Sequence, residues 1–275
     1  MQTDSLEFQE AVVVPRDAFE RFDGLTVVER PGWLQLIAPA FRQGGLNGVA
    51  CAQLSDAEAD AVIDETVATY QRLGVRWRWT VSPESTPLDL AERLERRGLM
   101  REVVRAMVRE TAREAWPEAP GVTVEVADAS TVELHARTMA AGWQMDVGPI
   151  RDFNRLLLSA PSRRHALFLA RVDGEPAASA GLTLFERSAY LVGAVVLPAF
   201  RRRGVYRALT AARLDFARAR GIALATSQAK VATSAPLLET LGFRAVCEFP
   251  VLHGTPRSCG DDAWGWTGQG TTPTE

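Results

Sequence analysis

The sequence is poor in lysine, cysteine and histidine, and these shortages exclude several classes of protein. Lys230 is the only lysine among 31 cationic side chains, so arginine carries nearly all of the positive charge. The three cysteines and three histidines are scattered and form no Cys-x-x-Cys or Cys/His ligand spacing. The pattern therefore predicts neither a disulfide scaffold nor a metal site.

Long apolar runs and a strong net charge are missing as well. No apolar stretch approaches the roughly 20 residues of a membrane span. The acidic first ten residues lack the cationic and apolar regions of a secretion signal. The net charge of −3 gives no reason to expect nucleic-acid binding. We therefore expect a cytoplasmic protein that binds neither a membrane nor nucleic acid.

The sequence does contain an ordinary globular composition and an internal repeat. Its 275 residues, 47% hydrophobic and 24% charged, suit two domains or one large one. In each half a strand-like segment precedes a long amphipathic helix, followed by glycine, strand, short helix, glycine and strand. The long helices are predicted over 57–74 and 205–221, after strands at 46–54 and 188–197. Both halves are interpreted as copies of one α/β unit.

A proline-containing segment at 113–122 separates the two copies. We predict a first domain over 1–115, a second domain over 121–254 and an irregular tail over 255–275. Within the second domain, the Asp-Gly pair at 173–174 predicts a two-residue hairpin with a type I′ turn.

The two copies differ most where the long helix begins. The first copy has SDAE at 55–58, a capping-box pattern that satisfies free backbone N–H groups and places carboxylates at the positive end of the helix dipole. The second has PAFRRRG at 198–204, which lacks a capping side chain and sets three arginines against the dipole. Such a start costs about 0.3–1 kcal/mol for each exposed charge.

A phosphate-bearing ligand would turn this unfavourable start into a binding site. A helix N-terminus presents free N–H groups to an anion, and Gly204 permits close approach of the backbone. The alternative is a solvated arginine cluster at the start of a surface helix. The apolar strand before the segment and the long amphipathic helix after it favour the phosphate-binding interpretation.

These residues resemble the signature of the GNAT superfamily of acyl-CoA-dependent N-acetyltransferases. In that family a strand and Val-x-Pro precede Arg/Gln-x-x-Gly-x-Gly/Ala at a helix start. This sequence has VLP at 196–198, RRRGVY at 201–206 and a second family mark, LGF, at 241–243. The resemblance covers about 121–254. It implies an α/β (α+β) fold of two tandem GNAT-like domains, each a mixed, mostly antiparallel sheet flanked by helices, with a degenerate first copy that lacks the pyrophosphate loop.

The resemblance also implies acetyl-CoA as co-substrate and indicates which residues hold it. Backbone amides of the loop cradle the pyrophosphate, and the edge of the preceding strand pairs with the pantetheine arm. An N–H where this strand splays from the next polarises the thioester for direct attack by a neutral amine. The implied coenzyme A residues are Ala194, Val195, Val196, Arg201, Arg202, Arg203, Gly204, Val205, Tyr206 and Arg207.

Departures from the family pattern leave the catalytic residues unassigned. Tyr206 stands where the loop normally ends in Gly or Ala, and it adds bulk and a hydroxyl near the phosphates. Leu238 stands where many members carry a tyrosine that protonates the leaving thiolate, and Val231 replaces a usual asparagine. Direct transfer can proceed without a protein acid, because a coenzyme A thiolate is a tolerable leaving group.

Three residues are candidates for the acceptor end. In the family, the region that contains Trp143 and Asp146 shapes the acceptor pocket, so Trp143 could stack on a substrate and Asp146 could hold an ammonium group. The alternative, which we favour, packs Trp143 in the core and makes Asp146 a helix cap. Gln228 could hydrogen-bond a substrate or a proton-relay water, or it could be a strand-end polar residue.

The leading hypothesis is an N-acetyltransferase that transfers an acetyl group from acetyl-CoA to a small-molecule amine in a ternary complex. A second hypothesis is a non-catalytic acyl-CoA or small-molecule binding protein. A third is a protein-amine acetyltransferase whose first copy serves as an interaction module. The acceptor, the acyl chain and the choice between monomer and homodimer stay open at the level of sequence.

Overall fold

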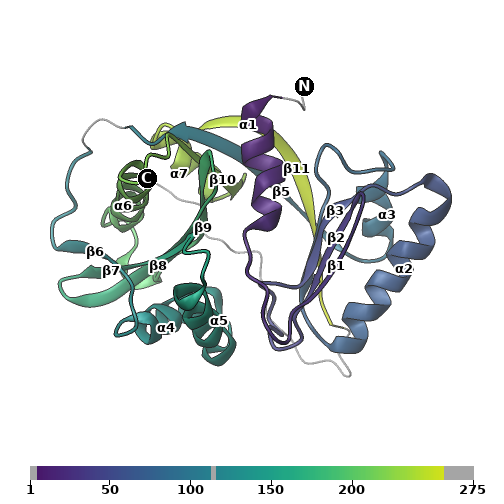
Figure 1. The fold of residues 1–275 in the computed structure, drawn as a ribbon, viewed down its shortest axis with the longest axis horizontal. Coiled ribbons are helices and arrows are strands. Elements are labelled where there is room, and N and C mark those ends of the chain that lie inside the picture. Colours follow the sequence, from purple (N-terminus) through teal and green to yellow (C-terminus); the bar gives the residue numbers. More distant parts are fainter. Residues whose placement is uncertain (1–4, 113–115, 257–275) are drawn as a thin grey trace. The chain divides into compact units, whose positions relative to one another are not determined.

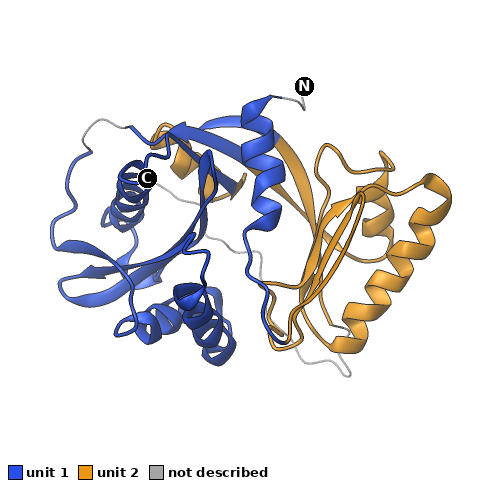
Figure 2. Cartoon of the chain, viewed as in Figure 1, with its two compact units in different colours: residues 1–23, 106–228, 243–247 blue, residues 24–105, 229–242, 248–275 orange. Residues whose placement is uncertain are grey.

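The computed structural model describes residues 5–112 and 116–256, which excludes most of the predicted tail. Its chain forms two compact units (Figure 2). Unit 1 comprises residues 1–23, 106–228 and 243–247, and unit 2 comprises residues 24–105, 229–242 and 248–275. The strands β5 (Met100–Glu110) and β11 (Arg244–Gly254) contribute residues to both units. No helix in the described ranges is long and apolar enough to cross a membrane.

Unit 1 begins with a short helical segment and continues with a mixed α/β arrangement. Its elements are α1 (Leu6–Phe8), the π-helix η1 (Gln9–Val13), the 3-10 helix η2 (Val14–Asp17), β6 (Val122–Val126), α4 (Val132–Trp143), α5 (Val147–Ser159), β7 (His165–Val172), β8 (Glu175–Leu184), β9 (Ser188–Val196), η3 (Pro198–Phe200), α6 (Val205–Arg218) and most of β10 (Leu224–Lys230).

The sheet of unit 1 has helices on both of its faces. Its strands lie in the order β10-β9-β8-β7-β6, with antiparallel pairing except between β10 and β9, which are parallel. Helices α4 and α5 cover one face and α6 covers the other (Figure 1). The predicted hairpin at 173–174 is confirmed, because Asp173 and Gly174 have φ values of 52° and 88°, as a type I′ turn requires.

Unit 2 also combines a sheet with helices. Its elements are β1 (Thr26–Arg30), β2 (Trp33–Ile37), β3 (Gly48–Ala52), α2 (Asp56–Leu73), β4 (Trp77–Thr80), α3 (Leu90–Arg96) and α7 (Ser234–Thr240). The strand order is β1-β2-β3-β4-β11, and Val251–Gly254 of β11 pair antiparallel with β4.

Aromatic side chains fill the core of unit 2. The rings of Tyr70 and Trp77 stack with centroids 4.6 Å apart, and Trp33 meets Trp79 edge-on at 5.5 Å. All four side chains are buried. Their burial supports the sheet against α2. The predicted α/β fold class with mostly antiparallel strand pairing is confirmed.

Candidate functional site

The loop between β9 and α6 ends in a helix start without a side-chain cap. Gly204 is the N-cap of α6, adopts φ +75° and provides no capping side chain, as the sequence predicted. A Cβ atom at this position would lie 2.9 Å from the Cβ of Ala119, so only glycine fits without displacement. Arg202 also adopts a left-handed conformation, with φ +62°. The backbone therefore turns sharply twice just before the helix.

Three backbone N–H groups at the start of α6 lack an acceptor within the helix. The first bond from α6 to its cap runs from the N–H of Ala208 to the oxygen of Gly204, at 3.0 Å. The N–H groups of Val205, Tyr206 and Arg207 precede it and are directed out of the helix end. Together with the positive end of the helix dipole, they form an arrangement that suits a phosphate group.

Arginine side chains surround this helix start. Arg201, Arg202 and Arg203 are all exposed. Arg203 pairs with the Asp173 carboxylate at 2.7 Å, and the Nε of Arg201 donates to the Val196 oxygen at 3.4 Å. One of the three loop charges is thus partly neutralised by protein, while the others face solvent and are available to an anion.

A fully buried arginine lies about two turns into α6. The Arg213 side chain is 1% exposed and donates to the Leu209 oxygen and the Thr210 hydroxyl, each at 3.3 Å. Burial lowers the pKa of Arg213 below its ordinary value, and the nearby Tyr206 side chain opposes that effect. Burial likewise raises the pKa of Tyr206, against the opposing effect of Arg213. Tyr206, the departure from the family pattern, thereby connects the loop to a buried positive charge.

The edge of β9 that leads into the loop opens away from β10. Parallel pairing between the two strands ends at Thr226 and Tyr190. Beyond that point, β9 keeps its antiparallel partner β8 but has a bulge opposite Ala180, where Gly193 adopts φ +63°. The β10-facing edge at Ala194–Val196, a stretch of intermediate exposure, therefore matches the predicted place for an extended amide-bearing ligand.

A buried histidine supports the strand opposite this bulge. His135 of α4 has Nε2 at 3.2 Å from the Ala180 oxygen, and Asn154 of α5 donates to its Nδ1 at 3.0 Å. Since the amide NH₂ only donates, Nδ1 accepts and the Nε2–H donates to Ala180. Burial lowers the pKa of His135 to about 4, outweighing the raising effect of the bond to Ala180. His135 is therefore neutral at pH 7 and fixes the backbone beside the opening.

The structure places the three predicted acceptor residues in unit 1. Trp143 ends α4 with 42% of its surface exposed, next to Gly142, which packs against Val195 of β9. Asp146 occupies the N-cap position of α5 without a side-chain capping bond. Gln228 of β10 donates from Nε2 to the Ala11 oxygen of η1 at 3.0 Å. The roles of these three residues stay predictions.

Leu238 and Val231, the two departures from the family pattern in this region, carry no proton donor in their side chains. Leu238 of α7 is 2% exposed and apolar, and Val231 follows β10 in a turn. In the described ranges, no group of three or more His, Cys, Asp or Glu side chains is arranged to hold a metal ion.

Sequence reasoning missed a cluster on the N-terminal segment of unit 1. Glu20 accepts hydrogen bonds from Ser162 at 2.7 Å and from Arg164 and His165 at 3.0 Å. Burial alone would raise the pKa of Glu20, but these bonds outweigh it and hold that pKa below its ordinary value. Glu10, on η1, is also buried. The only signal in the sequence was the apolar spacing of Phe8, Ala11 and Val12 in an otherwise acidic stretch.

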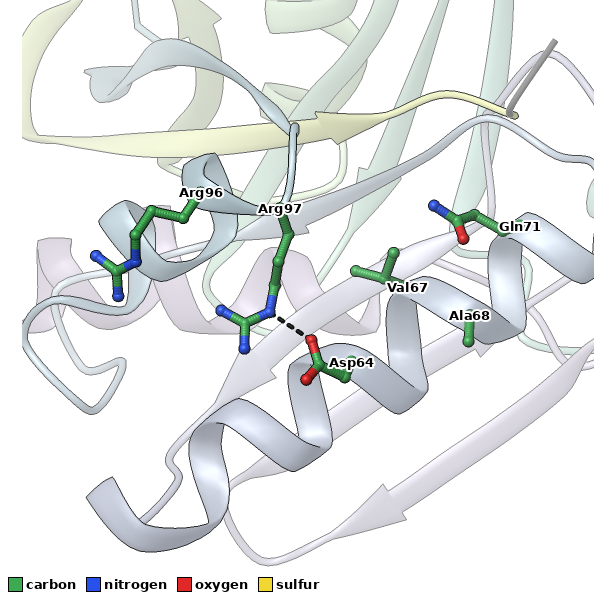
Figure 3. Close-up of a pocket in the computed structure, with 6 residues that line it drawn as sticks. All are labelled: Asp64, Val67, Ala68, Gln71, Arg96 and Arg97. Carbon is green, nitrogen blue, oxygen red and sulfur yellow. Dashed lines mark hydrogen bonds and ion pairs between the residues drawn. The ribbon is translucent and has the colours of Figure 1, made fainter.

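The corresponding helix start in unit 2 is closed by its own residues. Ser55 and Glu58 form the predicted capping box, with the Ser55 N–H donating to Glu58 at 3.2 Å. Further along α2, Asp64 pairs with Arg97, the residue just after α3, at 2.6 Å along an open hollow of about 430 Å³ (Figure 3). The side chains that line this hollow are Asp64, Val67, Ala68, Gln71, Arg96 and Arg97. It lies in unit 2, and the loop before α6 belongs to unit 1.

Comparisons with known proteins agree with this geometry. Residues 129–243 match the family model described as Acetyltransferase (GNAT) family. A GCN5-related N-acetyltransferase from Kribbella flavida has 21% identity and a TM-score of 0.61, with 90% of this chain and 94% of that chain covered. A tandem GNAT protein from the clavulanic acid biosynthesis pathway has 11% identity and a TM-score of 0.55, covering 90% and 89%.

A conserved protein of unknown function from Staphylococcus epidermidis is also similar in fold. It has 12% identity and a TM-score of 0.63, with 86% of this chain and 96% of that chain covered. At these identities the three structures support the fold, and the family model supports the assignment of the second copy. The comparison with curated proteins gives no match.

Proposed function

Since residues 129–243 match the acetyltransferase (GNAT) family model, we propose that the protein is an N-acetyltransferase that uses acetyl-CoA. The acetyl group passes to an amine of a small molecule by direct attack in a ternary complex. The observation that carries this proposal is the uncapped, arginine-flanked start of α6, which directly follows the open edge of β9. Acetyl-CoA combines a polyanionic end with an amide-bearing arm, so it suits both features.

The binding roles follow from the positions of the residues. The N–H groups of the first turn of α6 hold the pyrophosphate, and Arg202 and Arg203 add positive charge at the surface. Arg213, buried within α6, adds a positive charge close to Tyr206. The pantetheine amides pair with the β9 edge at Ala194–Val196. Arg201 and Arg207 complete the cationic surroundings of the loop.

The reaction needs orientation more than a protein acid. A neutral amine nitrogen forms a bond to the acetyl carbon, the carbon–sulfur bond breaks, and coenzyme A leaves as a thiolate while the nitrogen loses a proton. Positioning of the two reactants supplies a large part of such a rate enhancement. The bulge at Gly193, supported through Ala180 by His135, is the proposed place where a backbone N–H polarises the thioester.

The proposal gives the whole chain a single coenzyme A site. The second domain, over 121–254, binds acetyl-CoA, and the first domain, over 1–115, supports it. Carboxylates at the start of α2, in the first domain, oppose phosphate binding there. Trp143, Asp146 and Gln228 are the proposed acceptor-side residues, and the exposure of Trp143 supports stacking on a substrate.

A second candidate function is binding of an acyl-CoA without turnover. It is favoured by Leu238, which is buried and has no proton to donate at the position where many family members carry an acid. This candidate predicts the same binding of coenzyme A as the first and no release of its thiol.

Two measurements test the proposal. Calorimetric titration with acetyl-CoA is expected to show one site per chain, and the absence of binding would contradict both candidates. A thiol-release assay with a panel of small primary amines then separates them, because only an acetyltransferase frees the coenzyme A thiol in an amine-dependent way. Binding without thiol release across the panel would favour the second candidate.

A further inference from the structure

The N-terminal segment of unit 1 packs against its sheet. Ser5 caps α1 by accepting from the Phe8 N–H at 3.2 Å, and Phe8, Ala11 and Val12 are buried. Further along, the Phe22 ring lies 5.7 Å from the Phe153 ring of α5. The segment thus packs against α5 of unit 1. In the sequence, α5 comes directly after the region of Trp143 and Asp146 that is proposed to receive the acceptor.

The π-helix η1 presents two neighbouring residues to two neighbouring strands. Its Ala11 oxygen accepts from Gln228 of β10, and its Glu10 carboxylate accepts from the Ser188 hydroxyl of β9 at 2.6 Å. A π-helical turn is wider than an α-helical turn and often marks a functional site. Here it brings a carboxylate to the strand pair that opens beyond Tyr190.

Glu10 is a buried carboxylate without a cationic partner among the described residues. Glu10 is 7% exposed. Its hydrogen-bond partner, Ser188, is fully buried and neutral. Glu20 on the same segment provides the contrast, because it takes two bonds from Arg164 and His165. A buried charge is costly unless a group of opposite charge compensates it. Glu10 can therefore take a cation as an additional partner.

A second buried polar group on the same strand face also lacks a partner. Thr226 is fully buried, and its Oγ1 has no hydrogen-bond partner in the described part of the chain. Thr226 pairs in register with Tyr190, and Leu224 pairs with Ser188, so these residues share one face of the sheet. By the same alternation Val192 shares that face, and it is 38% exposed. The face that carries Ser188 and Thr226 therefore reaches solvent near the bulge.

We propose that Glu10 is the anchor for a cationic nitrogen of the acceptor, so that the preferred substrates are amines that carry a positive charge at neutral pH. Ser188 holds the carboxylate in place, and the Thr226 hydroxyl is the neighbouring polar contact. This assignment rests on the proposed function, because it places the acceptor on the same strand pair whose open edge receives acetyl-CoA. Glu10 binds the substrate and is given no part in bond making.

The test compares wild-type protein with the Glu10→Gln and Glu7→Gln variants. Glutamine at position 10 keeps an oxygen that can accept from Ser188 and removes only the charge. Glu7 lies on the same segment, pairs with Arg244 and is more exposed, so its variant is the matched control. Thermal unfolding is measured with 1,4-diaminobutane, spermidine and lysine methyl ester, and with 1,4-butanediol as an uncharged probe. Acetyl-CoA binding is measured separately by calorimetry.

At least one cationic amine is expected to raise the unfolding temperature of wild-type protein and of Glu7→Gln, with the response lost in Glu10→Gln. The diol is expected to have no effect on any of the three. In thiol-release assays, Glu10→Gln is expected to raise KM for a cationic amine at least tenfold with a smaller change in kcat. Without ligands, Glu10→Gln should unfold at the same or a higher temperature than wild type, since it removes an uncompensated charge.

Three results would overturn the assignment. These are an amine response retained in Glu10→Gln, a wild-type protein that binds acetyl-CoA but responds to no cationic amine, and a Glu10→Gln variant that unfolds at a lower temperature with unchanged KM. The last would show a structural role only. Failure of the proposed function is distinguishable, because it appears as the absence of acetyl-CoA binding in all three proteins whatever their response to amines.

Discussion

The helices α2 and α6 begin at equivalent places in the two copies, but their first turns have opposite chemistry. The α2 start is capped by Ser55 and Glu58, and Asp56 pairs with Arg93 of α3. The α6 start has glycine at its cap, exposed arginines before it and no capping side chain. One helix end satisfies its backbone donors internally, whereas the other leaves them for a ligand.

This difference is the basis for proposing a site in one copy and only a structural helix end in the other. In unit 2, Arg93 of α3 and Arg97 just after it pair with carboxylates of α2, including Asp60 and Asp64. In unit 1, α6 itself carries a buried arginine, Arg213. In the proposal, local charge more than backbone shape distinguishes the helix start that binds an anion.

The largest expected effect comes from reversing the charge at the α6 start. Arg202→Glu combined with Arg203→Glu places two carboxylates where the loop now has two exposed guanidinium groups. We expect acetyl-CoA binding to weaken by roughly 1,000-fold, about 4 kcal/mol, in calorimetric titrations at low salt. The loss should shrink as ionic strength increases, because exposed charges are screened.

Asp56→Ala and Arg96→Glu provide the controls for this comparison, since both change charge on α2 or α3 in unit 2. Each is expected to leave acetyl-CoA affinity within about twofold, well under 1 kcal/mol. Equal effects of the unit 1 and unit 2 variants would contradict the assignment of a single coenzyme A site.

The second prediction is that the stability of the two units responds differently to acid. The pKa of His135 falls from 6.5 to about 4 in the folded chain, so the unfolded chain binds this proton more readily. Stability from this group is therefore complete above pH 6.5 and is lost as the pH falls towards 4, by about 3 kcal/mol at most. In unit 2, Arg97 holds the pKa of Asp64 below its ordinary 3.8, so that pair stays ionised over the same range.

Hydrogen exchange followed by mass spectrometry between pH 7 and pH 4 can resolve this difference. Unit 1 should lose protection first in wild-type protein. His135→Gln retains a donor for the Ala180 oxygen and an acceptor for Asn154, and it should flatten the pH dependence of unit 1. An unchanged slope in this variant would assign the acid sensitivity to other groups.

Much of the fold could be predicted because hydrophobic spacing is a local signal. The period of α2 and α6, the capping box at Ser55 and the turn at Asp173-Gly174 all appear in neighbouring residues. The strands β1 and β2 and the helix α5 were not predicted, although α5 buries Ile150, Asn154 and Leu157 at helical spacing. The contribution of β5 and β11 to both units depends on contacts far apart in sequence, which no local pattern contains.

The candidate site was only partly predictable for the same reason. The loop before α6 is continuous in sequence, so its glycine and arginines form a readable motif. Arg213 is hidden because an arginine within an amphipathic helix normally reaches solvent. Glu10 and its partner Ser188 are 178 residues apart, so their contact has no sequence signature. Tyr206 was visible as a departure from the family pattern, but its proximity to the buried Arg213 needed the structure.

The third prediction tests whether the buried charge behind the α6 start contributes to binding. Arg213→Met removes a guanidinium that is held by neutral oxygens. At an effective dielectric constant of about 20 and a separation of about 10 Å, one charge pair contributes about 1.7 kcal/mol, so we expect acetyl-CoA to bind roughly tenfold more weakly. The ligand-free protein should be no less stable, because apolar replacement of a buried ion is often neutral or stabilising. Arg218→Met, at the exposed end of the same helix, is the control.

The smallest expected effect lies at the α2 start and concerns stability alone. Ser55→Ala removes the oxygen that accepts from the Glu58 N–H, so the capping box loses one of its two bonds. We expect the free energy of unfolding to fall by about 1 kcal/mol, measured by urea denaturation, with acetyl-CoA affinity unchanged. Thr69→Ala, on the exposed side of the same helix, should cost less because no helix end depends on it. A clear change in acetyl-CoA affinity in Ser55→Ala would mean that the α2 start takes part in binding, and the contrast between the two helix starts would no longer hold.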